Sequence, residues 1–177
     1  MTNINIVILR GLGGIGYMDN LAARCRALKK QGVDYVQIGG YDTWKTLAGQ
    51  LRRFSDKSVL IGHSFGVTGV LGAARRAGLD IPLVVTFDPS QYAGASWPLI
   101  GSGGNVVPMN VRKVINFYQV PWMPLAIGGQ KLYRDDGSLT GVTNTRVSNT
   151  SHVGISGRED LYDITVRAIL DITGGKL

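Results

Sequence analysis

Short apolar runs recur along the chain, and polar or glycine-containing segments separate them. Continuous apolar runs of this length are typical of strands that are buried on both faces, as they are in parallel sheets. Such runs lie at Ile4–Leu9, Val33–Ile38, Ser58–Ile61, Ile81–Phe87 and Val114–Tyr118, and a weaker one lies at Val142–Val147. The pattern therefore predicts six strands.

Helical patterns lie between most of these runs. The first predicted helix ends at Gly32, the second begins at Asp42, whose carboxylate would cap it, and the third begins at Ser64. The last runs from Arg158 to Ile172 and turns Ile164 inward. The third helix also carries a row of glycines, at Gly66, Gly69 and Gly72. Glycine costs about 1 kcal/mol relative to alanine inside a helix, so this row indicates close packing against the sheet.

Alternating strands and helices with short links predict an α/β fold. We expect a three-layer sandwich, in which a mostly parallel six-stranded sheet lies between two layers of helices. The pattern contains no internal repeat, and residues 1–177 are expected to form a single domain.

Two longer segments break the alternation. Pro89–Asn110 carries Trp97, and Pro121–Gly141 carries Trp122; each segment follows a predicted strand. Open α/β sheets bind their ligands at the carboxyl ends of the strands. We therefore expect both tryptophans to contact substrate.

The composition excludes some kinds of site. A single cysteine, Cys25, allows no internal disulfide and no cysteine-based zinc site, and we expect it to be a buried thiol. No apolar run approaches the roughly 20 residues that a membrane-spanning helix needs. The first residues lack the basic region of a signal peptide, so a cytoplasmic location is the default expectation.

The net charge of +7 comes from cations that are spread over three predicted helices. Such scattering is typical of solvated helix faces. Attraction to an anionic envelope or a lipid interface is the functional alternative. Nucleic-acid binding is not expected, because basic and aromatic residues do not interleave and no binding module is recognisable.

The candidate chemistry begins at Gly62-His63-Ser64-Phe65-Gly66, a G-x-S-x-G pattern that lies directly between a predicted strand and a predicted helix. In a nucleophile elbow the chain turns so sharply that the residues two before and two after the serine must be nearly free of side chain. Gly62 and Gly66 occupy these places. The pattern therefore predicts that Ser64 is a nucleophile at the end of a strand.

A serine hydroxyl becomes an effective nucleophile when a base accepts its proton. The chain has two histidines. His63 adjoins the serine and should point away from the hydroxyl, which leaves His152, in a polar loop after the last strand, as the base. The acid that orients the imidazole is assigned to Asp88, at the end of an apolar strand, with Asp135 or Asp136 as the alternative.

An oxyanion hole needs two backbone N–H donors that point at the developing negative charge. We assign one donor to Phe65, the residue after the serine. The other is assigned to Leu12, in the glycine-rich loop after the first strand.

The order serine, aspartate, histidine is that of α/β-hydrolases, and the chain resembles the small bacterial lipases and esterases of this superfamily that lack a cap domain. Arg10-Gly11-Leu12-Gly13-Gly14 resembles their His-Gly-x-Gly-Gly oxyanion segment, with arginine in place of histidine. Asp88 departs from the usual pattern, because it follows the strand after the nucleophile helix instead of the next-to-last strand. The resemblance implies cleavage of a small-molecule or lipid-like acyl ester through an acyl-enzyme, with no metal or cofactor.

Two other interpretations stay open. Residues 11–16 spell G-x-G-x-x-G between a strand and a helix, which is typical of Rossmann-type dinucleotide-binding oxidoreductases. The second predicted strand, however, does not end in the acidic residue that would bind a ribose hydroxyl. The chain could also be a non-catalytic binding protein on a hydrolase scaffold, because a fold does not by itself establish chemistry.

Overall fold

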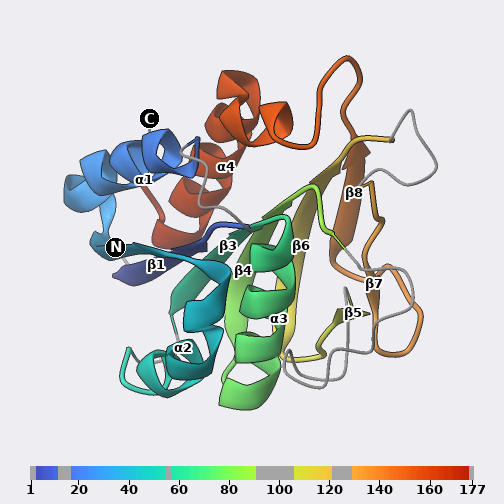
Figure 1. Cartoon of the computed structure of the whole chain (residues 1–177). Coiled ribbons are helices and arrows are strands. Elements are labelled where there is room, and N and C mark those ends of the chain that lie inside the picture. The colour runs from blue at the N-terminus through green and yellow to red at the C-terminus, as the bar shows by residue number, and fades with distance from the viewer. Residues whose placement is uncertain (1–2, 12–16, 55–56, 91–105, 121–128, 176–177) are drawn as a thin grey trace.

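The computed structural model describes residues 3–11, 17–54, 57–90, 106–120 and 129–175, and its centre is a six-stranded sheet (Figure 1). The strands are β1 (Ile4–Leu9), β2 (Val33–Gly39), β3 (Ser58–His63), β4 (Ile81–Phe87), β6 (Val111–Tyr118) and β8 (Val142–Arg146). Their order is β2-β1-β3-β4-β6-β8, and every neighbouring pair is parallel. The predicted six-stranded parallel sheet is therefore confirmed.

Helices cover both faces of this sheet, which confirms the three-layer sandwich. Helices α1 (Met18–Ala27) and α4 (Glu159–Thr173) lie on one face, and α2 (Trp44–Leu51) and α3 (Phe65–Ala77) lie on the other (Figure 1). Short 3₁₀ turns complete the helical segments at Leu28–Gln31, Tyr41–Thr43 and Gly154–Gly157. Among the described residues, no helix is long and apolar enough to cross a membrane.

The continuous apolar strands follow from this two-sided burial. Alternate residues of a strand point to opposite faces of the sheet. In β1, Ile6 and Ile8 belong to the core between the sheet and the α1–α4 layer, whereas Val7 and Leu9 belong to the core beneath α2 and α3. A strand that serves two cores has no polar face.

Several local predictions differ from the structure. The second helix is preceded by a 3₁₀ turn, so Thr43, and not Asp42, stands at its N-cap position, without a side-chain capping bond. Ile164 is 44% exposed, because it lies two residues from the buried Tyr162 and so on the opposite side of α4. In α3, a β-carbon added at Gly72 would meet nothing within 4 Å, so the close approach of this helix does not extend to that glycine.

The segments between β4 and β8 contain a second, small sheet that the pattern did not predict. Strands β5 (Val106–Val107) and β7 (Tyr133–Arg134) pair in parallel. The guanidinium of Arg134 is buried here and donates to the carbonyl oxygens of Pro108 and Arg112, at 3.4 and 3.1 Å. The small sheet lies beside the α3 side of the main sheet, since Val107 and Leu132 belong to the same core as α3.

Candidate active site

The sharp turn from β3 to α3 positions Ser64. This residue has φ 56° and ψ −125°, a conformation that few residues other than glycine adopt. Its N–H donates to the carbonyl of Phe87 at 3.0 Å, which ties the strained residue to the neighbouring strand β4. Backbone strain of this kind costs on the order of 1–3 kcal/mol and persists where the surrounding structure enforces it.

The two glycines that flank the serine are required by close contacts. A β-carbon at Gly66 would lie 2.2 Å from the carbonyl oxygen of Leu9, and one at Gly62 would lie 2.7 Å from the Cα of Val67. Both distances are far below van der Waals contact. The strand, turn and helix predicted around Ser64 are thus present, with glycine at the places where the turn leaves no room for a side chain.

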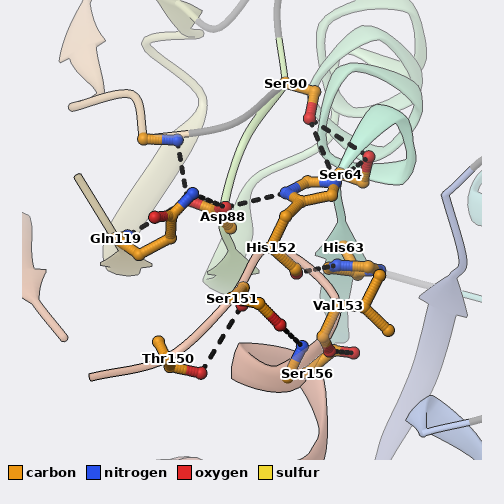
Figure 2. Close-up of polar contacts among 12 residues, drawn as sticks. His63, Ser64, Asp88, Ser90, Gln119, Thr150, Ser151, His152, Val153 and Ser156 are labelled. Carbon is orange, nitrogen blue, oxygen red and sulfur yellow. Dashed lines mark hydrogen bonds and ion pairs between the residues drawn. The ribbon is translucent and has the colours of Figure 1, made fainter. Parts of the chain in front are cut away.

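Three polar residues from distant parts of the chain meet at the carboxyl end of the sheet (Figure 2). The Nε2 atom of His152 lies 2.9 Å from the Oγ of Ser64. Its Nδ1 atom lies 2.7 Å from the Oδ2 of Asp88. Asp88 is fully buried, whereas the His152 side chain is 22% exposed. The structure therefore brings together Ser64, His152 and Asp88, and the histidine contacts both of the others.

The Asp88 carboxylate is held by three further N–H groups. Its Oδ1 accepts from the backbone N–H groups of Gly129, at 2.7 Å, and Gln119, at 3.1 Å. Its Oδ2 accepts from the side-chain amide of Gln119 at 3.1 Å. A buried carboxylate needs such donors, because they replace the water it has lost. Gln119 was not predicted as a site residue, although its place at the carboxyl end of the strand next to β4 could have indicated that it lies near Asp88.

A network of side-chain hydrogen bonds fixes the segment that supplies Gly129. Thr86 on β4 donates to the side-chain oxygen of Asn116 on β6, at 2.7 Å, and Asn116 donates to the side-chain oxygen of Asn144 on β8, at 2.7 Å. Asn144 exchanges hydrogen bonds with both backbone groups of Leu132, at 2.9 and 3.0 Å. This network ties the chain near Gly129 to three neighbouring strands, and so supports the acid indirectly.

The two alternative acids are engaged elsewhere. Asp135 accepts from the guanidinium of Arg75 at 2.5 Å. Asp136 accepts from the backbone N–H of Ser138 at 2.9 Å, within the turn that follows β7. Asp88 is the carboxylate that contacts the imidazole of His152.

Ser90 is a site residue that the sequence did not reveal. Its Oγ lies 3.1 Å from the Oγ of Ser64 and 3.5 Å from the Nε2 of His152 (Figure 2). Ser90 is 1% exposed. It follows Asp88 by two residues, with Pro89 between them. Its position near the acid was visible in the sequence, but the direction of its side chain was not.

His63 points away from the Ser64 hydroxyl, in agreement with the prediction. Its Nε2–H donates to the backbone carbonyl of His152 at 3.0 Å, and the two imidazole rings lie 5.1 Å apart (Figure 2). Burial lowers the pKa of His63 to about 4. A neutral ring is therefore retained near neutral pH, and it secures the backbone of the loop that carries His152.

The lowered pKa of His63 predicts a pH-dependent stability. An unfolded histidine has a pKa of about 6.5, so the unfolded state binds a proton first as the pH falls. The contribution of His63 to the free energy of unfolding is complete above pH 6.5. It is lost as the pH falls towards 4, and the free energy of unfolding decreases by about 3 kcal/mol over this range. We expect chemical denaturation at pH 7 and pH 4.5 to show a smaller loss in His63→Gln than in the unaltered chain. Equal losses in both proteins would contradict this assignment.

Gly11, which follows β1, lies directly beside the serine. A β-carbon at Gly11 would lie 2.6 Å from the Cβ of Ser64 and 3.0 Å from its Oγ. Arg10, which stands where the resembled lipases have histidine, forms an ion pair with Asp19.

Phe65 begins α3 and its ring lies 6.3 Å from that of Tyr41. Leu12, Trp97 and Trp122 lie outside the described residues.

Other predicted features can be placed as well. Cys25 is fully buried, as expected, and burial raises the pKa of its thiol to about 12. Within the described ranges, no group of three or more histidine, cysteine, aspartate or glutamate side chains could hold a metal ion. Part of the positive charge is paired locally, since Arg24 forms ion pairs with Glu159 and Asp163.

Of three comparisons with known proteins, the one with solved structures agrees with the architecture. No protein-family model matches the chain, and no curated protein matches it. Among solved structures, the chain is similar to a proposed hydrolase of the alpha/beta superfamily from Xanthomonas campestris pv. campestris, with a TM-score of 0.57 and 12% identity over 98% of this chain and 99% of that one. An extracellular alpha/beta-hydrolase from a Paenibacillus species matches 51% of this chain and 42% of its own, at 17% identity, but its TM-score of 0.37 is too low to support a conclusion. The chain has an α/β-hydrolase fold.

Proposed function

We propose that this chain is a serine hydrolase that cleaves carboxylic esters, of the lipase or esterase type, through an acyl-enzyme intermediate. The observation that carries the proposal is the pair of contacts made by His152, at 2.9 Å to the hydroxyl of Ser64 and at 2.7 Å to the carboxylate of Asp88. Nucleophile and base within hydrogen-bond reach, with the base oriented by a third group, are the requirements of nucleophilic catalysis.

The proposed reaction has two halves. The Oγ of Ser64 attacks the ester carbonyl while its proton passes to the Nε2 of His152, and Asp88 stabilises the imidazolium that forms. His152 then gives this proton to the departing alkoxide, which leaves as the alcohol. In the second half, water attacks the acyl-enzyme as His152 accepts a proton from it, and Ser64 recovers its hydrogen when the acid is released.

The oxyanion of each tetrahedral intermediate needs its own donors. We assign these to the backbone N–H groups of Leu12 and Phe65, and a donor of this kind contributes about 3 kcal/mol to the transition state in related reactions. The close approach of Gly11 to the serine supports a role for the loop after β1, because it brings backbone next to the reacting hydroxyl.

The substrate is proposed to be a small-molecule or lipid-like acyl ester. Trp97 and Trp122 are proposed as its apolar contacts, and a medium or long acyl chain, or an interfacial substrate at a lipid or anionic envelope, would suit them. The rate of hydrolysis of nitrophenyl esters should then not fall steadily as the acyl chain lengthens from two to eight carbons.

The dinucleotide-binding alternative has less support. Gly11, the first glycine of the G-x-G-x-x-G run, lies against Ser64. The sharp turn at Ser64 therefore already explains why this position is a glycine. The strand order, with β1 between β2 and β3, also differs from the order 3-2-1-4-5-6 of the dinucleotide-binding fold.

Covalent labelling tests the proposal. A fluorophosphonate reacts with activated serines, so we expect one equivalent to be incorporated and mass spectrometry to locate it on Ser64. Protein unfolded before the reaction is the control and should stay unlabelled, because unfolding separates Ser64 from His152. Labelling at another residue, or none in the folded protein, would overturn the proposal, and the binding-protein interpretation would then take its place.

A further inference from the structure

A second hydroxyl lies within reach of both reacting atoms of the site. Ser90 Oγ is 3.1 Å from Ser64 Oγ and 3.5 Å from His152 Nε2, and these two atoms are 2.9 Å from each other. The three atoms form a compact triangle at the carboxyl ends of β3 and β4. Ser64 and Ser90 are 4% and 1% exposed, so bulk water does not compete freely for their hydrogen bonds.

The available protons decide which hydroxyl donates to which. The Nδ1 of His152 faces the carboxylate of Asp88 and must carry a hydrogen, because a carboxylate can only accept. In the neutral ring Nε2 is therefore an acceptor, and at 2.9 Å it accepts a hydrogen bond from the hydroxyl of Ser64. This hydrogen bond uses the only hydrogen of the Ser64 hydroxyl, so the hydrogen in the contact between the two serines is that of Ser90.

We propose that Ser90 is a further catalytic residue, whose hydroxyl donates to the Oγ of Ser64 and stabilises the negative charge that develops there. This inference rests on the proposed function, because it concerns the same nucleophile. Donation to a neutral hydroxyl is weak, whereas donation to a charged oxygen is roughly twice as strong. The contact therefore lowers the energy of the transition state more than that of the resting enzyme.

The same hydroxyl serves both halves of the reaction. As Ser64 loses its proton to His152, its oxygen becomes alkoxide-like, and Ser90 donates to it. When the acyl-enzyme is hydrolysed, the bond between the acyl carbon and this oxygen breaks, the oxygen again carries negative charge, and the Ser90 donation recurs until His152 returns a proton. Ser90 keeps its own hydrogen throughout, so no further proton acceptor is needed.

The test replaces the hydroxyl and measures hydrolysis of a short nitrophenyl ester. We expect Ser90→Ala to lower kcat about 10- to 100-fold, with little change in KM, since a hydrogen bond to a charged group has an effect of this size. The rate of labelling by a fluorophosphonate should fall with kcat. Ser90→Thr retains a hydroxyl and should keep most of the activity.

Two further variants separate this role from a loss of structure. Ser90→Cys keeps the size of the side chain but offers a weak donor, so its kcat should fall as in Ser90→Ala even if the alanine variant folds poorly. Ser58→Ala is the matched control, because Ser58 is also a buried serine, at the opposite end of β3, and its hydroxyl has no hydrogen-bond partner among the described residues. Its kcat should equal that of the unaltered chain.

The outcomes distinguish this inference from the proposed function. An unaltered chain that is labelled at Ser64 and hydrolyses ester, together with an unchanged kcat in Ser90→Ala and Ser90→Cys, would overturn the role of Ser90 alone. Equal losses in Ser90→Thr and Ser90→Ala would also overturn it, because the hydroxyl would then make no difference. An unaltered chain that is neither labelled nor active would overturn the proposed function itself.

Discussion

Replacing Ser64 with alanine is expected to lower the rate of ester hydrolysis by a factor on the order of 10⁶, to the level left by binding and the oxyanion donors. The substitution removes the oxygen that forms the acyl-enzyme, so neither the base nor the acid retains a function. His152→Ala should be almost as severe, and combining the two should add little, since the residues act as one unit. The measurement is the initial rate with a nitrophenyl ester, after removal of contaminating esterases.

The backbone at Ser64 calls for a second variant. Alanine at φ 56° keeps the strain of the turn, whereas glycine adopts positive φ without a steric penalty. Ser64→Gly should therefore be as inactive as Ser64→Ala but at least as stable as the unaltered chain in thermal unfolding. Substantial hydrolysis by both variants would show that the nucleophile lies elsewhere.

The sheet could be predicted because its physical cause is simple. Each central strand is buried on two faces, so its apolar residues are continuous and stand out from the rest of the sequence. The polar edge strand β8 gave a weaker signal for the same reason: it has a burial pattern of intermediate and exposed residues. The pair β5 and β7 has two residues in each strand, too few for any period to be recognised.

The candidate site could be predicted where the sequence offers few residues for a given role. The glycines around Ser64 have a steric cause that is local in the sequence, and the chain has only two histidines. The orientation of His63 followed from its place next to the serine. Ile164 was misplaced because its spacing from Leu161 fits a helical face, while the centre of that face is set by Tyr162 and Ile169, both fully buried.

The groups that surround the acid could not be predicted in the same way. Gly129 and Gln119 reach Asp88 through backbone N–H groups, and the direction of such groups depends on how a loop returns to the sheet. Asp88 itself has φ 47°, so its side chain leaves β4 in a direction that a strand pattern does not suggest. Hydrogen bonding of this kind is a property of the assembled loops, not of residue spacing.

Replacing Asp88 with asparagine is expected to lower kcat by a factor of about 10⁴, the loss that a wrong histidine tautomer causes in a comparable triad. The contacts show how the error arises. The amide oxygen of asparagine would remain at the place of Oδ1, where two backbone N–H groups of Gln119 and Gly129 need an acceptor. The amide nitrogen would then face Nδ1 of His152, which must become an acceptor. Its Nε2 would carry the hydrogen and could no longer accept one from Ser64.

Asp135→Asn is the matched control for this variant. Asp135 was the alternative acid, but it is exposed to solvent and pairs with Arg75. The same chemical change should therefore leave kcat unaltered, and the stability nearly so, because exposed ion pairs contribute about 0–1 kcal/mol. Full activity in Asp88→Asn would remove the acid from the proposed mechanism, and loss of activity in Asp135→Asn would transfer the role to that residue. A large loss in Asp88→Asn alone, with both proteins folded, is the result that the two backbone N–H donors to Oδ1 lead us to expect.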